Sequence, residues 1–291
     1  DPLLTAFTAQ IDQWVKSNLV HNSDSFGKLV VSLPGVDPSL IFESIKRLEK
    51  NKQIQVIKAT SSLEFFFDSS PNQPYFDDLL PVPHPLDYEW RYDTSALEFL
   101  TNLSLEYSSP KEQIVLLGTP SLVKIVSEQP VQRVWTLYDA NIRVLQYLSH
   151  RLPRFPTVYY DATVDTPFSL DASLVVADPP WYLEYLKLFI WSASHFLRSK
   201  GHLLLSVPPA GTRPGIKNEV DSLIKWAYGV GFRLMAHNEG ILPYKTPPFE
   251  QNVFRALGLR GVPSPWRYGD LLIFCLQHRN NVPRPIIATR E

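Results

Sequence analysis

The sequence predicts an α/β protein in which a doubly wound, mostly parallel sheet follows a small α+β domain. Three features predict this. From residue 113 onward, short apolar runs alternate with amphipathic segments, as strands and helices do in a parallel sheet. Residues 1–70 instead show helical periodicity followed by two short β-rich segments. Five prolines within residues 69–90 separate the two parts.

Composition limits the classes of function. The chain has 291 residues, of which 44% are hydrophobic, so it can bury a core in one large domain or two smaller ones. Its net charge of −1 argues against a broad electrostatic grip on nucleic acid or membrane, and leaves a local patch open. The single cysteine, Cys275, excludes an internal disulfide, and no Cys or His spacing suits zinc. We therefore expect a cytoplasmic protein that binds no metal and, lacking an apolar run of about 18 residues, no membrane.

Residues 1–70 have the plan of a winged helix. We expect helices at residues 3–20, 26–33 and 39–52, followed by short strands at residues 54–58 and 62–68. Asp37 suits the cap of the third helix, and Pro38 suits its first position. Other small α+β domains share this order of elements.

The winged-helix-like domain has two interpretations. Its third helix carries Lys46, Arg47, Lys50 and Lys52, which would suit contact with DNA. Residues 1–70 nevertheless hold seven Lys and Arg against eight Asp and Glu, whereas a DNA-binding module is usually basic. The balance favours a protein partner or self-association through this domain.

Residues 71–90 are predicted to be a proline-rich linker, and residues 91–291 to form the sheet domain. Residues 91–107 look helical. The expected strands are residues 113–118, 134–139, 157–161, 173–180, 201–207, 232–238 and 270–276. The expected helices between them are residues 141–152, 182–199 and 219–231. The continuous apolar character of the strands is typical of a sheet that is buried on both faces.

The residues that follow the strands are the candidates for chemistry, because ligands of open parallel sheets bind at the carboxyl ends of the strands. The first strand ends in Gly118-Thr119-Pro120-Ser121. The next two end in Asp139 and in Asp161-Ala162, and the fourth ends in Asp178-Pro179-Pro180-Trp181. Three carboxylates and one glycine turn are thereby expected along one edge.

Asp139 follows Gly118 by 21 residues, the spacing of an acid that binds the ribose of a nucleoside cofactor. The turn is not G-x-G-x-x-G, and the chain has no Walker lysine motif, so pyrophosphate is not the expected ligand. A cofactor with a ribose and no phosphate fits better, and S-adenosylmethionine is such a cofactor. The alternative is that Asp139 caps the following helix.

The Asp178-Pro179-Pro180-Trp181 tetrad carries the strongest signal. Two prolines hold the backbone extended after the strand and remove two donors, so carbonyl groups stay free to accept hydrogen bonds. An amine bound to Asp178 and a proline carbonyl would direct its lone pair at a methyl donor, and catalysis would rest on positioning. Trp181 or Tyr182 could stack on a flat substrate. The alternative is a Pro-Pro turn that only ends the strand.

Four segments carry a resemblance to a known family: LLGTPSL (116–122), LYDANIRVL (137–145), VYYDATVDTPFSL (158–170) and LVVADPPWY (174–182). They resemble the probable N6-adenine methyltransferases, some of which are protein-lysine methyltransferases, and the segment DYEWRYDTSAL (87–97) resembles the aromatic segment before that family's core. The resemblance spans roughly residues 87–210. It implies a Rossmann-like class I methyltransferase fold, S-adenosylmethionine as cofactor, and a nucleic acid or a protein as the amine substrate. By position, the Gly118 turn would adjoin the methionine part, Asp139 the ribose, Asp161 with Ala162 the adenine, and Asp178 to Tyr182 the target amine.

The N-terminal domain departs from that family's minimal plan and leaves other functions open. A winged helix joined to such a core also resembles the branched-chain polyamine synthases, which transfer aminopropyl groups. Those enzymes carry Gly-Asp-Asp-Asp after the first strand, where this chain has Gly-Thr-Pro-Ser and no carboxylate for a polyamine. A third interpretation, favoured by the same turn, is a non-catalytic binding protein with a degenerate methyltransferase fold.

Residues 241–270 are expected to be an insertion over the active site. Tyr244, Lys245, Phe249 and Arg255 are its candidate substrate-binding residues, because aromatic and arginine side chains suit bases and phosphates. A proline-stiffened lid and a dimer contact are the alternatives. Trp266 and Arg267 also suit the packing of a turn.

Overall fold

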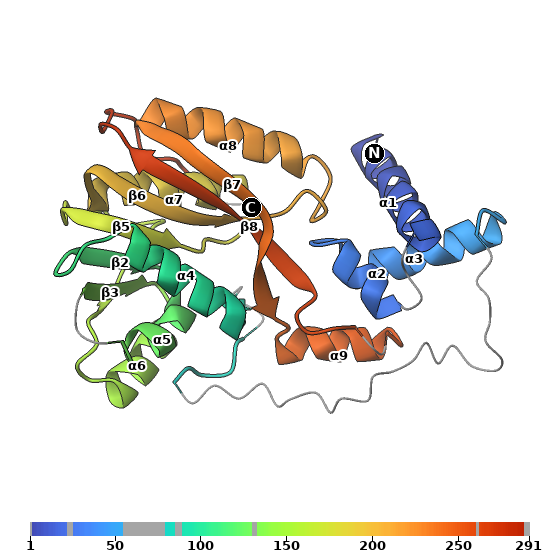
Figure 1. Cartoon of the computed structure of the whole chain (residues 1–291), viewed down its shortest axis with the longest axis horizontal. Coiled ribbons are helices and arrows are strands. Elements are labelled where there is room, and N and C mark those ends of the chain that lie inside the picture. The colour runs from blue at the N-terminus through green and yellow to red at the C-terminus, as the bar shows by residue number, and fades with distance from the viewer. Residues whose placement is uncertain are drawn as a thin grey trace.

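The computed structural model describes residues 2–21, 26–54, 79–84, 89–129, 133–259 and 262–287. Within these residues the strands form one eight-stranded sheet in the order β1-β7-β8-β6-β5-β2-β3-β4 (Figure 1). The strands are β1 (Arg91–Tyr92), β2 (Gln113–Leu117), β3 (Val134–Asp139), β4 (Thr157–Tyr159), β5 (Ala172–Ala177), β6 (Leu197–Val207), β7 (Phe232–Lys245) and β8 (Arg267–Leu276).

The sheet is mostly parallel, and its strand order reverses at β2. Strands β6, β5, β2, β3 and β4 run parallel, while β8 is antiparallel to both β6 and β7, and β1 is antiparallel to β7. From β2 the chain crosses to β3 and β4 on one side, and later to β5 and β6 on the other. This confirms the predicted doubly wound sheet and puts its switch point beside β2.

Helices cover both faces of the sheet. One face carries α4 (Thr94–Glu106), α5 (Val123–Val126) and α6 (Ile142–Arg151), and the other carries α7 (Leu183–Phe196) and α8 (Ile216–Val230). Successive side chains of β2 alternate between the two cores: Val115 and Leu117 face α7 and α8, and Ile114 and Leu116 face the other group. The continuous apolar runs of the sequence are explained by this double burial.

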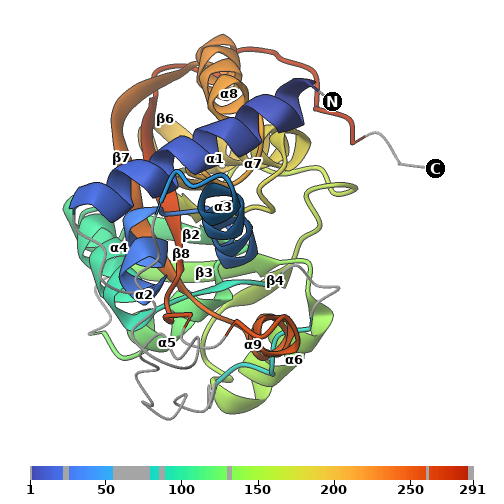
Figure 2. The same ribbon diagram turned by 90° about the vertical axis from the view of Figure 1, so that its right-hand side faces the viewer.

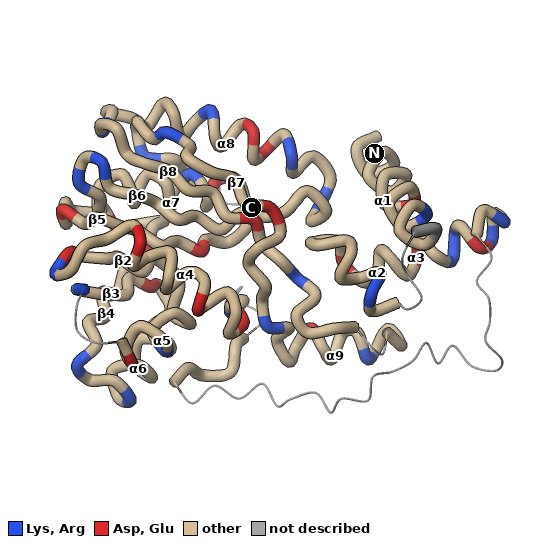
Figure 3. Tube along the Cα trace, viewed as in Figure 1, with Lys and Arg blue, Asp and Glu red and all other residues tan. Residues whose placement is uncertain are grey.

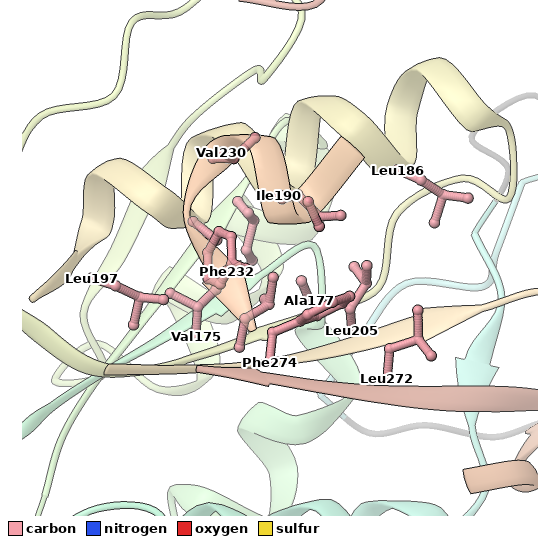
Figure 4. Packing of buried hydrophobic residues seen from close by; sticks show 14 of the residues in the cluster. Val175, Ala177, Leu186, Ile190, Leu197, Leu205, Val230, Phe232, Leu272 and Phe274 are labelled. Carbon is pink, nitrogen blue, oxygen red and sulfur yellow. The ribbon is translucent and has the colours of Figure 1, made fainter. Parts of the chain in front are cut away.

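Figure 4 shows the first of these cores at close range. Leu186 and Ile190 of α7 point down onto Val175, Ala177 and other side chains of the sheet, all of them buried. The close packing holds the carboxyl ends of the central strands in fixed positions, and those ends carry the predicted site residues.

The N-terminal region contains α1 (Pro2–His21), α2 (Phe26–Ser32) and α3 (Pro38–Lys50). Asp37 caps α3, since its carboxylate accepts the Ser39 amide at 2.8 Å, and Pro38 occupies the first turn, as predicted. Apart from Ile54, the strands expected at residues 54–58 and 62–68 lie outside the described residues. A winged helix therefore remains a prediction.

The N-terminal helices share a core with the C-terminal part of the chain. Phe7, Ile11 and Leu29 belong to the same buried cluster as Phe254 and Trp266. Phe254 lies on α9 (Pro248–Ala256), and Trp266 precedes β8. Figure 1 shows β7 and β8 leaving the sheet toward α9, and Figure 2, turned by 90°, shows the N-terminal helices in front of the sheet.

Two boundaries differ from the predicted ones. Strand β7 continues to Lys245 and β8 already begins at Arg267, so the segment between them is residues 246–266 and not 241–270. Residues 91–107 form the short strand β1 followed by α4, because Asp93 caps the helix by accepting the Ala96 amide at 3.0 Å.

Charges of both signs are interspersed along the chain (Figure 3). On α3, Arg47 forms a 2.7 Å ion pair with Asp12 of α1, so one of the four basic residues proposed for DNA serves helix packing. Among the described residues, no helix is both long and apolar enough to cross a membrane.

Candidate active site

A cavity of about 770 Å³ opens at the carboxyl ends of β2, β3, β4 and β5. Its lining includes most of the residues that the sequence singled out: Gly118, Pro120, Asp139, Asp161, Ala162, Asp178, Pro179, Pro180, Trp181, Tyr182 and Tyr244. The three carboxylates and the glycine turn thus meet in one cavity, as their positions after parallel strands require.

The turn after β2 presents its backbone to the cavity. Gly118 has φ +66°, and its amide donates to the Tyr138 carbonyl at 2.9 Å. A Cβ at this position would lie 3.1 Å from the Phe189 ring, so glycine serves both the conformation and the space. Thr119 and Ser121, expected at the cofactor, are buried and do not line the cavity, because the tight turn at Pro120–Leu122 directs them inward.

Asp139 stands at the end of β3 with its carboxylate toward the loop before α6. It accepts the Asn141 amide at 2.7 Å, while the cap of α6 is Asn141 itself, whose side chain accepts the Arg143 and Val144 amides. Burial raises the pKa of Asp139 to about 7, against the effect of the Asn141 hydrogen bond, and the negative charge of Glu89 adds to the rise. Capping therefore does not account for Asp139.

Asp161 follows β4 in a tight turn. Its carboxylate accepts the Thr163 amide at 2.8 Å and the Thr163 hydroxyl at 2.6 Å, which fixes the side chain locally. Both residues line the cavity, together with the buried Ala162. This part of the lining is separate in sequence from Asp139 and faces the same space.

Asp178 is held by hydroxyl groups from neighbouring strands. The Tyr244 hydroxyl of β7 donates to Asp178 Oδ1 at 2.7 Å and lies 2.6 Å from the Ser206 hydroxyl of β6. Burial raises the pKa of Asp178 to about 7, although hydrogen bonds from Tyr244, Ser206 and Tyr92 lower it in part. Burial and the Asp178 charge raise the pKa of both tyrosines well above 10, so they remain donors.

The carbonyl groups of the tetrad are not all free. The Pro180 carbonyl accepts the Tyr182 amide at 2.7 Å, and the Trp181 carbonyl accepts Nη1 of Arg213 at 2.7 Å. No described residue donates to the Pro179 carbonyl. A ligand amine that bound Asp178 and a proline carbonyl would therefore use Pro179.

Aromatic rings enclose the cavity beside Asp178. The Trp181 and Tyr244 rings meet edge to face at 5.5 Å, and the Trp90 and Tyr244 rings do so at 6.5 Å. The Arg267 guanidinium lies over the Trp90 ring, 3.6 Å from its centre. Gly269 of β8 makes room here, because a Cβ would come within 3.0 Å of the Trp181 ring.

Three predicted substrate-binding residues lie outside the cavity lining: Lys245, Phe249 and Arg255. Arg255 is exposed on α9 and donates to the Asn252 side chain at 2.9 Å. Helix α9 buries Phe254 against the N-terminal helices, so its other side faces away from that core. Tyr244 alone of the four reaches the cavity, from β7.

Sequence reasoning missed Glu89, Trp90 and Arg213 as lining residues and did not single out Arg267 as a substrate-binding residue. Arg213 lies in the loop after β6, and inspection of that strand end would have found it. Glu89 and Trp90 lie in the DYEWRYDTSAL segment, where the resemblance marked the aromatic character and not a place in the cavity. Arg267 belongs to the C-terminal segment whose aromatic and arginine residues are expected to suit bases and phosphates, although packing of a turn is the alternative for Trp266 and Arg267.

No known protein-family model matches the sequence, and no curated protein matches it. Among solved structures, the chain is similar to a mutein of the branched-chain polyamine synthase from Thermus thermophilus in complex with N4-aminopropylspermidine and 5'-methylthioadenosine, with TM-score 0.71 and 10% identity over 99% of this chain and 94% of that chain. The branched-chain polyamine synthase of the same organism gives TM-score 0.70 and 11% identity over 96% and 90%. The N-methyltransferase NodS from Bradyrhizobium japonicum WM9, in complex with S-adenosyl-L-homocysteine, gives a TM-score of 0.41. Its sequence identity is 14%, over 62% of this chain and 86% of that chain.

At such identities the comparisons establish the fold. The chain shares the fold of the branched-chain polyamine synthase over nearly its whole length, N-terminal helices included. The Rossmann-like sheet expected from the sequence is confirmed, and no comparison assigns the chain to the N6-adenine or protein-lysine methyltransferases.

Proposed function

We propose that the protein is an S-adenosylmethionine-dependent N-methyltransferase that transfers a methyl group to an amine held at Asp178. One observation carries the proposal: a single cavity joins Gly118, Asp139 and Asp161 to the Asp178-Pro179-Pro180-Trp181 tetrad. A nucleoside donor and an amine acceptor need these two sets of groups within the length of one small molecule.

The residues at the cofactor end fit S-adenosylmethionine. The Asp139 carboxylate suits ribose hydroxyls, the Gly118 backbone allows close approach, and Asp161 with Ala162 suits the adenine end. When bound, the cofactor supplies a methyl group on a positively charged sulfur.

The chain's own part in the reaction is to orient and deprotonate the acceptor. The amine would donate one N–H to the Asp178 carboxylate and one to the Pro179 carbonyl, which directs its lone pair toward the cofactor end. The bound cofactor would supply the methyl group to this nitrogen, which Asp178 and Pro179 would hold in place. The nitrogen then loses one proton, and Asp178, with a pKa of about 7, suits its acceptance near neutral pH. Tyr244 holds the carboxylate in place throughout.

The acceptor we favour is an exocyclic adenine amine or a protein lysine. Trp181 and Tyr182 line the cavity next to Asp178, and Tyr182 is 44% exposed, as a residue at an entrance would be. These rings could stack on a base or flank an alkyl chain. A cytoplasmic location and a protein partner for the N-terminal helices belong to the same proposal.

Aminopropyl transfer is the second candidate, and the whole-length similarity to the branched-chain polyamine synthase favours it. It would use the same nucleoside cavity and the same Asp178, with an aminopropyl group in place of methyl. Two features weigh against it: the turn after β2 reads Gly118-Thr119-Pro120-Ser121 without a carboxylate, and Arg267 puts a cation in the cavity.

Calorimetry tests the proposal and separates the candidates. A methyltransferase should bind S-adenosylmethionine and S-adenosylhomocysteine, whereas an aminopropyltransferase should prefer decarboxylated S-adenosylmethionine and release methylthioadenosine. Asp178→Asn should abolish transfer and keep cofactor binding, and Asp221→Asn, on the exposed face of α8, is the matched control. If S-adenosylmethionine, S-adenosylhomocysteine and decarboxylated S-adenosylmethionine all fail to bind, both transferase functions are excluded and the non-catalytic binding protein is the remaining candidate.

A further inference from the structure

Arg267 is a cavity-lining cation whose hydrogen-bonding capacity the protein does not use. Its guanidinium rests on the Trp90 ring at 3.6 Å and lies 4.9 Å and 5.7 Å from the ring centres of Trp266 and Trp181. Among the described residues, its one ion-pair contact is with Glu250, at 3.5 Å, and none accepts a hydrogen bond from it. The side chain keeps 24% of its surface exposed, and it lines the cavity.

Other arginines of this chain behave differently. Arg213 donates to the Trp181 carbonyl at 2.7 Å and to Glu219 at 2.5 Å. Arg279 donates to the carbonyls of Ser194, His195 and Leu197. An arginine that only supports the fold spends its five donors on protein acceptors in this way. The stacked Arg267 is held by its flat face, which leaves its N–H edge for a ligand.

The remaining charges of the cavity fit one amine better than several. Glu89 accepts Nε of Arg91 at 2.7 Å, and the Asp161 carboxylate is engaged by Thr163. With Asp139 assigned to the ribose, Asp178 is the carboxylate left for an amine. A second ammonium on the acceptor would meet the Arg267 cation, whereas a carboxylate or phosphate would meet a planar fork of donors that matches its oxygens.

We propose that Arg267 binds an anionic group of the acceptor, so that the substrate is an amine that also carries a carboxylate or a phosphate. This inference rests on the proposed function in one respect, the place of the amine at Asp178. Tyr244 links the two positions, since it hydrogen-bonds Asp178 and packs edge to face against Trp90, the ring under Arg267. One molecule can therefore reach both groups within the cavity.

Two matched pairs of probes test the inference without turnover. The first pair is the diamine cadaverine and the carboxylated amine aminovalerate, and the second is adenosine and adenosine monophosphate. Each is titrated into the full chain with S-adenosylhomocysteine present, and binding is followed by tryptophan fluorescence, since Trp90 and Trp181 line the cavity. In at least one pair the anionic member should bind about tenfold more tightly or better, and the responding pair identifies carboxylate or phosphate.

Variants assign the preference to Arg267. In Arg267→Met the advantage of the anionic member should fall to about twofold or less, and Arg267→Lys, which keeps the charge without the planar fork, should retain part of it. Arg233→Met removes an exposed arginine at the far end of β7 and should change nothing. Equal or absent binding of both members in both pairs, or a full preference in Arg267→Met, overturns the inference. Calorimetry with S-adenosylmethionine is run separately, so a failure of the proposed function shows there and not in the probe titrations.

Discussion

The hydroxyl of Tyr244 donates a 2.7 Å hydrogen bond to the carboxylate of Asp178, 66 residues earlier in the chain. The same hydroxyl lies 2.6 Å from that of Ser206, and Tyr92 pairs with Tyr244 across β1 and β7. The antiparallel extension of the sheet thus controls the group that ends a central parallel strand. Strands β1 and β7 serve the site through this contact, because they bring Tyr92 and Tyr244 next to Asp178.

Tyr244→Phe should shift the pH dependence of transfer upward. The Tyr244 hydrogen bond lowers the pKa of Asp178, which burial has raised to about 7, so its loss should raise that pKa further. Transfer needs the ionised carboxylate, and kcat/KM should therefore rise through a higher pH than in the wild type. The measurement is kcat/KM from pH 5.5 to 9, with Tyr228→Phe on the exposed face of α8 as control. An unchanged pH profile would show that the Tyr244 hydrogen bond does not control the pKa of Asp178.

Asp178→Asn and Glu250→Gln should each make the protein more stable at pH 8 than the wild type. Burial raises the pKa of each carboxyl to about 7 in the folded state. A raised carboxyl pKa means that the folded state binds the proton more tightly, so stability falls as pH rises from about 4 to 7 and stays low above that range. Removal of either charge should recover on the order of 1 kcal/mol at pH 8 and little at pH 4.

Urea unfolding at the two pH values measures this difference, and the matched change is Glu43→Gln on the exposed surface of α3. Variants that lose stability equally at both pH values would contradict the assignment, since they would report lost hydrogen bonds and not relief of a buried charge.

Asp139→Asn should weaken cofactor binding by about tenfold or more. The amide keeps an acceptor for the Asn141 backbone, whose hydrogen bond to Asp139 is 2.7 Å long, so the loop should stay in place. It removes the charge that two ribose hydroxyls would share. Calorimetry with S-adenosylhomocysteine gives the affinity, and Asp171→Asn in an exposed turn is the control because asparagine tolerates its φ of +54°. Unaltered affinity would place the ribose elsewhere.

Trp266→Ala should destabilise the fold by about 3–5 kcal/mol. The side chain is 1% exposed, packs edge to face on Phe254 and Trp90, and donates its indole N–H to Glu250 at 3.0 Å. Trp226→Ala on α8, where the ring is only partly buried, should cost less. Thermal and urea unfolding compare the two variants, and a loss below about 1 kcal/mol for Trp266→Ala would mean that the N-terminal helices do not depend on this core.

The sheet and the strand-end carboxylates could be predicted because both follow from short-range pattern. Apolar runs such as residues 114–117 favour burial on both faces, and parallel strands bring Asp139, Asp161 and Asp178 to one edge whatever their exact partners. Whether Thr119 and Ser121 line the cavity depends instead on the direction of the tight turn at Pro120–Leu122, which its short sequence does not specify.

The acceptor side of the cavity depends on contacts that no local pattern encodes. Trp90 and Arg267 lie far apart in the sequence and meet at 3.6 Å because β7 and β8 continue beyond the parallel part of the sheet. The aromatic and basic residues of the C-terminal segment favour Phe249 and Arg255 as cavity residues as much as Arg267. Only the burial of Phe254 against α1 and α2 explains why α9 does not present Phe249 and Arg255 to the cavity.

The cluster that joins Phe7 and Ile11 to Phe254 and Trp266 has a consequence for how the chain acquires its form. The N-terminal helices bury apolar side chains against one another, and they complete this core only with Phe254 and Trp266, far later in the sequence. Arg267 directly follows Trp266, so the packing of Trp266 in this core also fixes the backbone that carries Arg267 to the Trp90 ring. The Arg267 side of the cavity is thereby coupled to a long-range contact between the N-terminal helices and α9, whereas the strand ends that hold Gly118, Asp139 and Asp161 are not part of that cluster.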